Sequence, residues 1–341
     1  MSVIDVDSLL IPISDEAPAG DNLEYDPGFT ELERLAEGKP EQQVGDSVIE
    51  AEPPDWKGVQ KQALELFTRT RDLRIGMHLA RALLREKGLL GFSDGLAVLR
   101  GMLEQYWPTV HPQLDPDDDN DPTMRINTLA TLADVQTTLR WLREAPLVES
   151  KMLGRFSLRD LDIAAGNIPV PDGLDTVPEM IAIDGAFMDC DVDALQALAD
   201  AVAAAVEHAA GIEAAVTTQV GAANTVDMDP LVKELKAAHG VLLDRLARRG
   251  VGEGAEAEAA GGEGGGRSIS GEVNTREDVI RVLDKACDYF ARHEPSSPVP
   301  LLLQRAKRLV SKNFMEIIQD LAPGGLAEAQ NISGVDTEGQ Y

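Results

Sequence analysis

The most constraining feature of the chain is a stretch that cannot contribute to a core. From Gly250 to Gly266 the sequence is almost entirely glycine, alanine and glutamate. Such a segment has almost nothing large and apolar to bury, so little offsets the entropy it would lose on becoming ordered. We expect a flexible linker over residues 249–272, with an r.m.s. reach on the order of 20–25 Å for its central 17 or so residues. The chain should therefore fold in separate parts on either side of this linker.

The residues before the linker show the spacing of α-helices. Apolar residues recur every three or four positions, and Asp55 and Asp72 stand where helix N-caps are expected. Few residues are aromatic, and alanine and leucine supply most of the apolar mass, which favours helices over sheets. The pattern predicts an extended segment over 1–27, a short helix around Phe29 to Leu35, and a loop over 37–54. It then predicts helices after Asp55, after Asp72, over about 92–106 and over 123–143, with an acidic loop over 108–122.

A group of prolines and glycines between residues 144 and 190 indicates a domain edge, which we place near residue 170. Beyond it, apolar residues at helical spacing continue from Val192 to Val220, and a second helical pattern covers 229–248. Two long helices joined by a short break form a helical hairpin. We therefore expect an N-terminal helical domain over 1–170 and a middle hairpin of long helices over 171–248.

The residues after the linker predict a small three-helix unit over 273–322, followed by a disordered tail over 323–341. Thr275 and Ser297 can cap the first two helices, and Pro298 suits a first helical turn. A core of about fifty residues is marginal alone, so the large apolar residues here favour self-association. The expected fold class is thus all-α, ending in a C-terminal oligomerisation unit. Its expected ring or core contacts are Leu302, Leu303, Leu309, Val310, Phe314, Ile317 and Ile318.

The formal net charge of −28 limits the partners of the chain. A field of this sign repels phosphate backbones and anionic lipid head groups, so we expect neither nucleic acid nor direct membrane insertion. No run of residues reaches the roughly 18 consecutive apolar positions of a membrane helix, and the N-terminus lacks the pattern of a secretory signal. The two cysteines, Cys190 and Cys287, fit buried reduced thiols. These features predict a cytoplasmic protein.

No motif in the chain predicts enzymatic chemistry, a cofactor or a metal. The five histidines are scattered, and none stands at metal-ligand spacing from cysteines or carboxylates. The acidic run from Asp115 to Asp121 suggests calcium, but an EF-hand loop beginning there would need glycine and glutamate where Asn120 and Ile126 stand. A solvated acidic loop before a helix is the better interpretation. The glycines near 261–266 are preceded by no predicted strand and followed by no Lys-Ser or Lys-Thr pair, so they are not a phosphate loop.

Two stretches of the chain stand out as motifs. The first runs from Pro18 to Pro27 and continues through Thr70–Arg74, Trp107–Pro112 and Arg125; the second is Glu294–Pro300 with the leucines that follow. Together they resemble the TssA family of the bacterial type VI secretion system, whose N-terminal region is called the ImpA N-terminal domain. The motif positions to which we assign a structural role are Gly20, Asp21, Tyr25, Pro27, Trp107, His111, Pro112, Glu294, Pro295, Ser297 and Pro298.

The resemblance implies a non-enzymatic cytosolic protein that forms rings through its C-terminal region. It implies contacts with the baseplate, inner tube and contractile sheath of the secretion machine. Family members with a long C-terminal extension cap the distal sheath end, whereas this chain ends soon after the second motif, which favours the baseplate role. Three alternatives remain open at this point: a distal sheath cap, an unrelated helical adaptor that forms no ring, and an enzyme or metal-dependent regulator.

Overall fold

The computed structural model describes residues 2–38, 42–44, 47–49, 51–171, 173, 176–222, 224–251, 280, 282–283, 286–287 and 299–309. The chain forms two compact units, Met1–Ala260 and Gly261–Tyr341. Their division falls within the predicted linker at 249–272, of which the residues after Val251 lie outside the described ones. No helix in the described ranges is long and apolar enough to cross a membrane.

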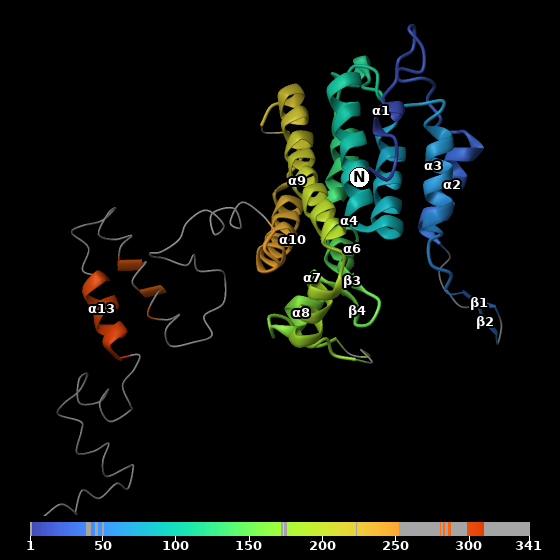
Figure 1. Ribbon diagram of the computed structural model, residues 1–341. Coiled ribbons are helices and arrows are strands. Elements are labelled where there is room, and N and C mark those ends of the chain that lie inside the picture. The colour runs from blue at the N-terminus through green and yellow to red at the C-terminus, as the bar shows by residue number, and fades with distance from the viewer. Residues whose placement is uncertain are drawn as a thin grey trace, which may run out of the picture. The chain divides into compact units, whose positions relative to one another are not determined.

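The first unit is a layered stack of helices (Figure 1). A layer of two short helices packs on a central long helix, which in turn packs against a further long pair. The helices are α1 Val6–Leu9, α2 Pro27–Glu37, α3 Trp56–Leu66, α4 Leu73–Tyr106, α5 Thr123–Ala130, α6 Thr138–Glu144, α7 Leu158–Ala164, α8 Met180–Asp189, α9 Val192–Val220 and α10 Asp229–Arg248. Short 3-10 turns occur at Pro116–Asp118 and Thr131–Ala133.

The central helix α4 is folded back on itself. Gly88 has φ 64° and ψ −152°, a left-handed conformation that glycine adopts without strain, and it interrupts the helix. The two arms then pack so closely that a Cβ on Gly95 would lie 2.6 Å from the Ala80 Cα atom. The predicted helices after Asp72 and over 92–106 are these two arms, so both are confirmed. The short helix expected around Phe29 to Leu35 is α2, and the start predicted after Asp55 is that of α3.

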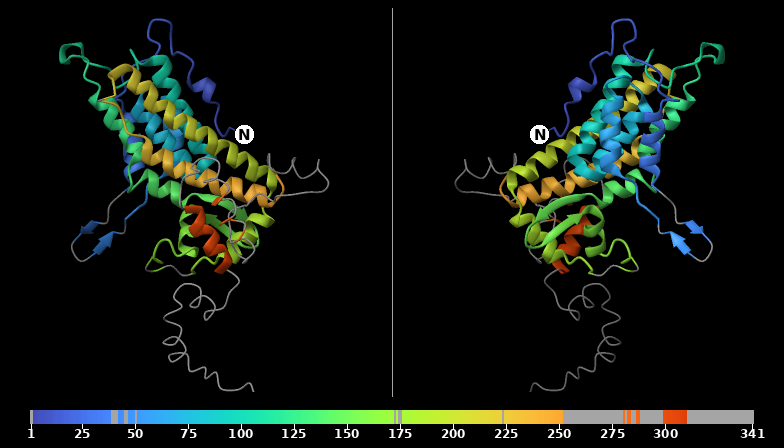
Figure 2. Two further views of the ribbon diagram at one scale, coloured as in Figure 1. Left: turned by 90° about the vertical axis from the view of Figure 1, so that its left-hand side faces the viewer. Right: turned by 90° about the vertical axis from the view of Figure 1, so that its right-hand side faces the viewer.

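One hydrophobic core runs through the whole first unit. Helix α9 packs along α4 as well as along α10, and buried residues from Leu23 to Leu246 form one continuous cluster. Figure 2 shows the first unit from two opposite sides, with α9 along the α4 region and α10 beside α9. The edge predicted near residue 170 therefore does not separate two cores, because α9 buries apolar residues such as Val202 and Ile212 in the same cluster as α4.

The prediction of a single long helix over 123–143 is wrong. The chain forms α5, a 3-10 turn and α6 instead, and Asp134 takes an extended conformation between them. The Asp134 carboxylate accepts bonds from the backbone N–H and hydroxyl of Thr137, at 2.7 and 2.6 Å. Local bonds of this kind compete with helix continuation. The freed Thr131 carbonyl is satisfied by the Thr138 hydroxyl at 2.9 Å and by Arg81 at 3.2 Å.

Two short antiparallel hairpins correct the expectation of an all-α chain. The first, β1 Gln42–Val44 and β2 Ser47–Ile49, lies in the predicted loop over 37–54. The second, β3 Pro146–Ser150 and β4 Gly154–Ser157, lies in the proline- and glycine-rich stretch that we assigned to a domain edge. Strands of three to five residues are too short to show a clear alternation of apolar and polar residues. The prolines and glycines around them indicate turns instead. The predicted extended segment over 1–27 also contains α1.

In the second unit the structure describes the helix α13, Val299–Leu309, and a few helical positions between 280 and 287. Cys287 Sγ lies 3.9 Å from the carbonyl oxygen of Pro300. The rest of the predicted three-helix unit and the tail lie outside the described residues, so they stay predictions.

Candidate functional site

The N-terminal motif residues come together as one set of internal bonds, which we call the motif clasp: residues 19–21, 70–73 and 107–112, with Arg125. Gly20 has φ 70°, and a Cβ there would lie 2.1 Å from the carbonyl oxygen of Arg69. Only glycine fits such a close approach in this conformation. The buried Thr70 hydroxyl donates to the Asp21 carbonyl at 2.7 Å, which ties the N-terminal segment to the start of α4.

Asp72 and His111 join this segment to the far end of α4. The Asp72 carboxylate accepts from the Arg74 N–H at 2.8 Å and so caps α4, while the Leu73 N–H donates to the His111 carbonyl at 2.9 Å. His111 is buried, and its Nε2 lies 3.1 Å from the Gly20 carbonyl oxygen. The peptide bond between His111 and Pro112 is cis. The motif histidine thus contacts the backbone of the N-terminal segment through Nε2.

Arg125 closes the clasp from a separate helix, α5. Its guanidinium donates to the carbonyl oxygens of Trp107, Val110 and Pro112 at 2.6, 2.6 and 2.7 Å. It also stacks over the Trp107 ring, 4.8 Å from the ring centre. Burial lowers the pKa of Arg125 to about 10, so the group is a cation at neutral pH. A cation suits this place because Trp107 is the C-cap of α4, where the helix presents unpaired carbonyls and a partial negative charge.

Arg71 repeats this arrangement at the other end of the clasp. The Arg71 guanidinium donates to the carbonyls of Phe67, Thr70 and Ile11, the last two at 2.9 and 2.5 Å. Burial lowers the pKa of Arg71, and its hydrogen bonds among the described residues all go to backbone carbonyls. Two buried arginines therefore act as hubs for backbone carbonyls, which is a structural role.

The structure separates the predicted motif positions into three groups. Gly20, Trp107, His111 and Pro112 lie in the clasp, and Pro27 occupies the first turn of α2 behind its N-cap, Asp26. Asp21 takes part through its backbone carbonyl. Tyr25, by contrast, is 92% exposed and makes no side-chain hydrogen bond to the described residues. Glu294, Pro295, Ser297 and Pro298 lie outside the described residues.

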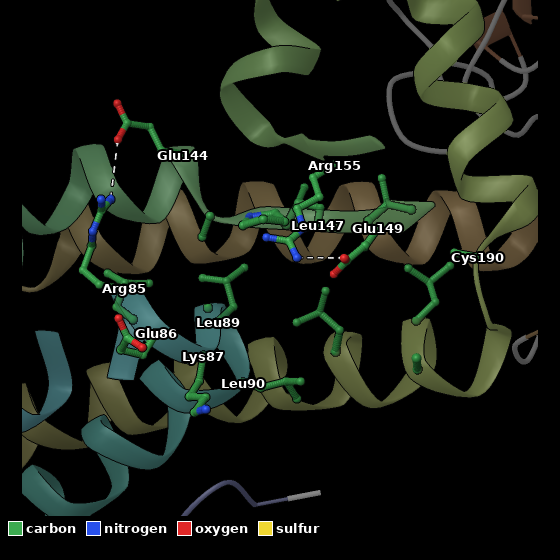
Figure 3. Close-up of a pocket in the computed structure, with 18 of the residues that line it drawn as sticks. Arg85, Glu86, Lys87, Leu89, Leu90, Glu144, Leu147, Glu149, Arg155 and Cys190 are labelled. Carbon is green, nitrogen blue, oxygen red and sulfur yellow. Dashed lines mark hydrogen bonds and ion pairs between the residues drawn. The ribbon is translucent and has the colours of Figure 1, made fainter. Parts of the chain in front are cut away.

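A groove of about 660 Å³ lies between the α4 turn, β3 and the start of α9 (Figure 3). Leucines line it, and its charged side chains include the ion pairs Arg85–Glu144 at 3.8 Å and Arg155–Glu149 at 2.8 Å. Cys190 also lines the groove, and burial raises the pKa of its thiol, with Arg249 opposing this only in part. A thiol with a raised pKa is a poor nucleophile at neutral pH. The groove therefore offers no activated group.

The titratable groups elsewhere point to the same conclusion. Burial, with a smaller contribution from the nearby Arg81, lowers the pKa of His78 to about 4, so His78 is neutral at physiological pH. The carboxylates of Asp115 and Asp121, in the acidic loop, accept from Asp117 N and Thr123 N and so cap turns. Sequence reasoning missed one acidic group, Glu213 with Asp227 and Asp229, whose ligand atoms lie within 4.8 Å of one another. The chain separation of these residues gave no recognisable spacing, and the last two are exposed.

Of the predicted oligomer contacts, Leu302, Leu303 and Leu309 lie on α13. Leu302 is 66% exposed, while the other two are half-buried. Val310, Phe314, Ile317 and Ile318 lie outside the described residues. Among the side chains of α13 that the structure describes, Leu302 is thus a large apolar one that faces solvent in a single copy of the chain.

The packed helices and the motif residues bound to backbone carbonyls define a helical domain whose motif residues hold its own fold together. Residues 10–134 match the family model described as ImpA, N-terminal, type VI secretion system. The chain is also 44% identical over 350 residues to the type VI secretion system component TssA1 of Pseudomonas aeruginosa, a match that covers 98% of this chain and 100% of that protein. The chain belongs to the TssA family of type VI secretion system components, which confirms the resemblance drawn from the motifs.

A solved structure shows the same fold in the first unit. It is the N-terminal domain, including the ImpA_N region, of the TssA component of the type VI secretion system from Burkholderia cenocepacia. The two share 24% identity with a TM-score of 0.59, and the match covers 74% of this chain and 97% of that one.

Proposed function

We propose that this chain is a ring-forming assembly component of the type VI secretion system. The C-terminal unit would gather copies into the ring, and the acidic first unit would contact other parts of the machine. The observation that carries the proposal is α13, an amphipathic helix whose Leu302 is 66% exposed in one copy. Exposed apolar side chains of this size on a helix face favour burial against a neighbouring copy. The match to the type VI secretion system component TssA1 along its full length supports a place in that system for the whole chain.

The proposed partners are further copies of the chain and the baseplate, inner tube and contractile sheath proteins. A ring holds many first units close together, so contacts that are weak for one copy become strong for the assembly. The net charge of −28 keeps free copies soluble and apart until the ring surface brings them together. No catalytic step is part of this proposal.

The ring is tested by changing Leu302 to Asp in the full chain, with Gln304→Asp as the matched control. Gln304 is also exposed on α13, so both variants add one negative charge to the same helix. We expect Leu302→Asp to shift the assembly to much smaller species by light scattering or mass photometry, while Gln304→Asp keeps the large mass. A full chain that runs as a monomer, or a Leu302→Asp variant that keeps its full size, would contradict the proposal.

We further propose a baseplate-side position, with a distal sheath cap as the second candidate. Both use the same ring, so they differ in location. A fluorescent fusion in a cell that assembles the machine should remain at the envelope while a labelled sheath grows. A signal that instead moves away with the growing sheath end would favour the cap.

A further inference from the structure

The first residues of the chain lie on the outside of the first unit. No residue from 2 to 18 is buried, and the first buried residue along the chain is Ala19, in the motif clasp. The segment is nevertheless packed in place, because α1 lies against α4 (Figure 1) and its apolar side chains contact the core from outside. These half-buried side chains are Ile4, Val6, Leu9 and Leu10. We call residues 2–11 the N-terminal strap.

One end of the strap is held by a single carboxylate. Asp94, on the second arm of α4, accepts from the backbone N–H groups of Val3 and Ile4 at 2.5 and 3.1 Å. Hydrogen bonds to a charged group are stronger than those between neutral groups. Because both donors are backbone N–H groups, this contact recognises the path of the main chain rather than the side chains at these positions.

The other end of the strap is held by bonds to its carbonyls and by one apolar side chain. The Tyr106 hydroxyl donates to the Leu10 carbonyl, and the Arg71 guanidinium donates to the Ile11 carbonyl at 2.5 Å. The Leu10 side chain lies over Gly101, where a Cβ would clash with it. Glycine inside a helix lowers helix stability relative to alanine. Its presence at position 101 within α4 is explained by the room that Leu10 needs.

The residues that hold the strap are themselves held by other parts of the fold. Arg71 also donates to two carbonyls of its own loop, and the other three residues, Asp94, Gly101 and Tyr106, lie within α4. We call these four residues the strap site. It offers hydrogen-bond partners to a main chain and a notch to one side chain, which are the elements by which proteins bind peptides.

The strap can leave this site without opening the motif clasp. The clasp fixes the chain from Ala19 onward, since the Arg71 N–H donates to the Ala19 carbonyl at 2.7 Å. The tether between strap and clasp is residues 12–18, none of which is buried. The eight steps from Ile11 to Ala19 span at most roughly 25–30 Å. This length sets the distance over which a released strap can reach.

We propose that the N-terminal strap of one copy binds the strap site of a second copy, in exchange for that copy's own strap. The occupant follows from the structure, because the sequence that fills the site is carried by every copy of the chain. Each bond of the closed chain is then made again between two chains. Exchange of an identical element is a low-cost route to association. The exchanged straps join the first units of neighbouring copies.

The exchange depends on how close the copies lie. In a free copy the short tether gives the chain's own strap a high effective concentration at its site. Copies held within reach of the tether offer a second strap at a similar concentration, so both arrangements are populated. The extent of exchange in the full chain therefore rests on the proposed ring, whereas the strap site itself does not.

The first test uses two full chains in which Cys190 and Cys287 are replaced by serine. One carries Leu10→Cys and the other Gly101→Cys, whose new side chain rejects the leucine of its own strap but has room for the shorter cysteine. Mild oxidation of the mixture should link the two chains. We expect at least tenfold more linked product than in a mixture where Val135→Cys, at an exposed position elsewhere, replaces Leu10→Cys. Equal linking in the two mixtures overturns the proposal.

The second test measures the strap site with a synthetic peptide of residues 2–13. In a full chain with Leu10→Asp, the charged side chain should release the chain's own strap, and one peptide should bind per chain. Adding Asp94→Ala should weaken binding at least fivefold, while adding Asp200→Ala, an exposed acid on α9, should leave it unchanged. A peptide that does not bind, or that binds equally well after Asp94→Ala, overturns the proposal. Linked chains in a protein that forms no large assembly would instead contradict only the ring.

Discussion

Arg125 is a buried cation whose hydrogen-bond partners are carbonyl oxygens from one short loop at the end of α4. The planar guanidinium suits this arrangement because its several N–H groups point in fixed directions toward separate acceptors. If Arg125 instead bound a carboxylate, its charge would be neutralised. Its N–H groups would then no longer be free to bind the three carbonyls of the loop. The group therefore acts as a template for the Trp107–Pro112 loop.

Replacing Arg125 tests this role. Arg125→Ala leaves three buried carbonyls without donors and should lower the unfolding free energy of residues 1–251 by about 3–5 kcal/mol. Arg125→Lys keeps the charge but loses the fork, so its loss should be intermediate. Urea unfolding followed by circular dichroism measures both. Arg34→Ala, at an exposed ion pair with Glu31, is the control and should leave the midpoint unchanged.

His78 should make stability depend on pH over a defined range. Burial lowers its pKa from 6.5 to about 4, so between these values the unfolded chain binds a proton that the folded chain does not. Stability should therefore fall as pH drops from about 6.5 to about 4, by on the order of 2–3 kcal/mol from this group, and not further below that. His78→Gln should flatten this part of the profile. Equal slopes for the two proteins would show that His78 is not responsible.

At the scale of elements, close packing sets the shape of α4. The two arms approach at Gly95 because that position has no side chain, and Gly76 meets Leu99 and Met102 in the same way. Small residues at such crossings let helix backbones approach more closely than ridge-and-groove packing of larger residues allows. The turn at Gly88 then places both arms in the middle layer of the first unit.

A matched pair of glycine substitutions separates packing from helix propensity. A Cβ at Gly95 would lie 2.6 Å from Ala80 Cα, whereas a Cβ at Gly240 in α10 meets nothing within 4 Å. Gly95→Ala should destabilise the first unit by about 1–3 kcal/mol, because the arms must separate. Gly240→Ala should stabilise it by about 0.5–1 kcal/mol, because alanine is the better helix former. Thermal melts of both variants measure these effects. A change in melting temperature in the same direction for both variants would contradict this account.

The sequence predicted those helix starts that depend on hydrogen bonds between residues close together in the chain. Asp55 and Asp72 cap α3 and α4 through bonds to residues two or three positions away, a distance at which the sequence pattern is visible. The clasp joins residues far apart in the chain, such as Thr70 with Ala19 and Arg125 with Trp107, so only the family resemblance pointed to these positions. Strands β3 and β4 depend on burial of Leu147 and Val148 against other elements, which no local pattern reports.

At the scale of the whole molecule, the charge opposes the proposed assembly. Each copy carries a net charge of −28, and bringing copies into a ring places these fields side by side. Apolar contacts such as the one proposed at Leu302 must exceed this repulsion. The balance between the two depends on how far the repulsion extends through the solvent.

Salt should therefore strengthen the assembly of the full chain. The screening length falls from about 30 Å at 0.01 M to about 8 Å at 0.15 M ionic strength, which weakens repulsion between copies while leaving apolar contacts in place. Mass photometry across this range should show larger species at higher salt. An assembly that instead dissociates as salt rises would indicate that ion pairs hold it together.

Most motif residues of the first unit face inward, onto the chain's own backbone, whereas Tyr25 is exposed. Selection can preserve such a signature simply because each copy must fold, whatever that copy later touches. Relatives with the same motif residues are then free to diverge on their outer surfaces and to bind different partner proteins. A search for docking determinants should accordingly begin at positions that the signature leaves unconstrained.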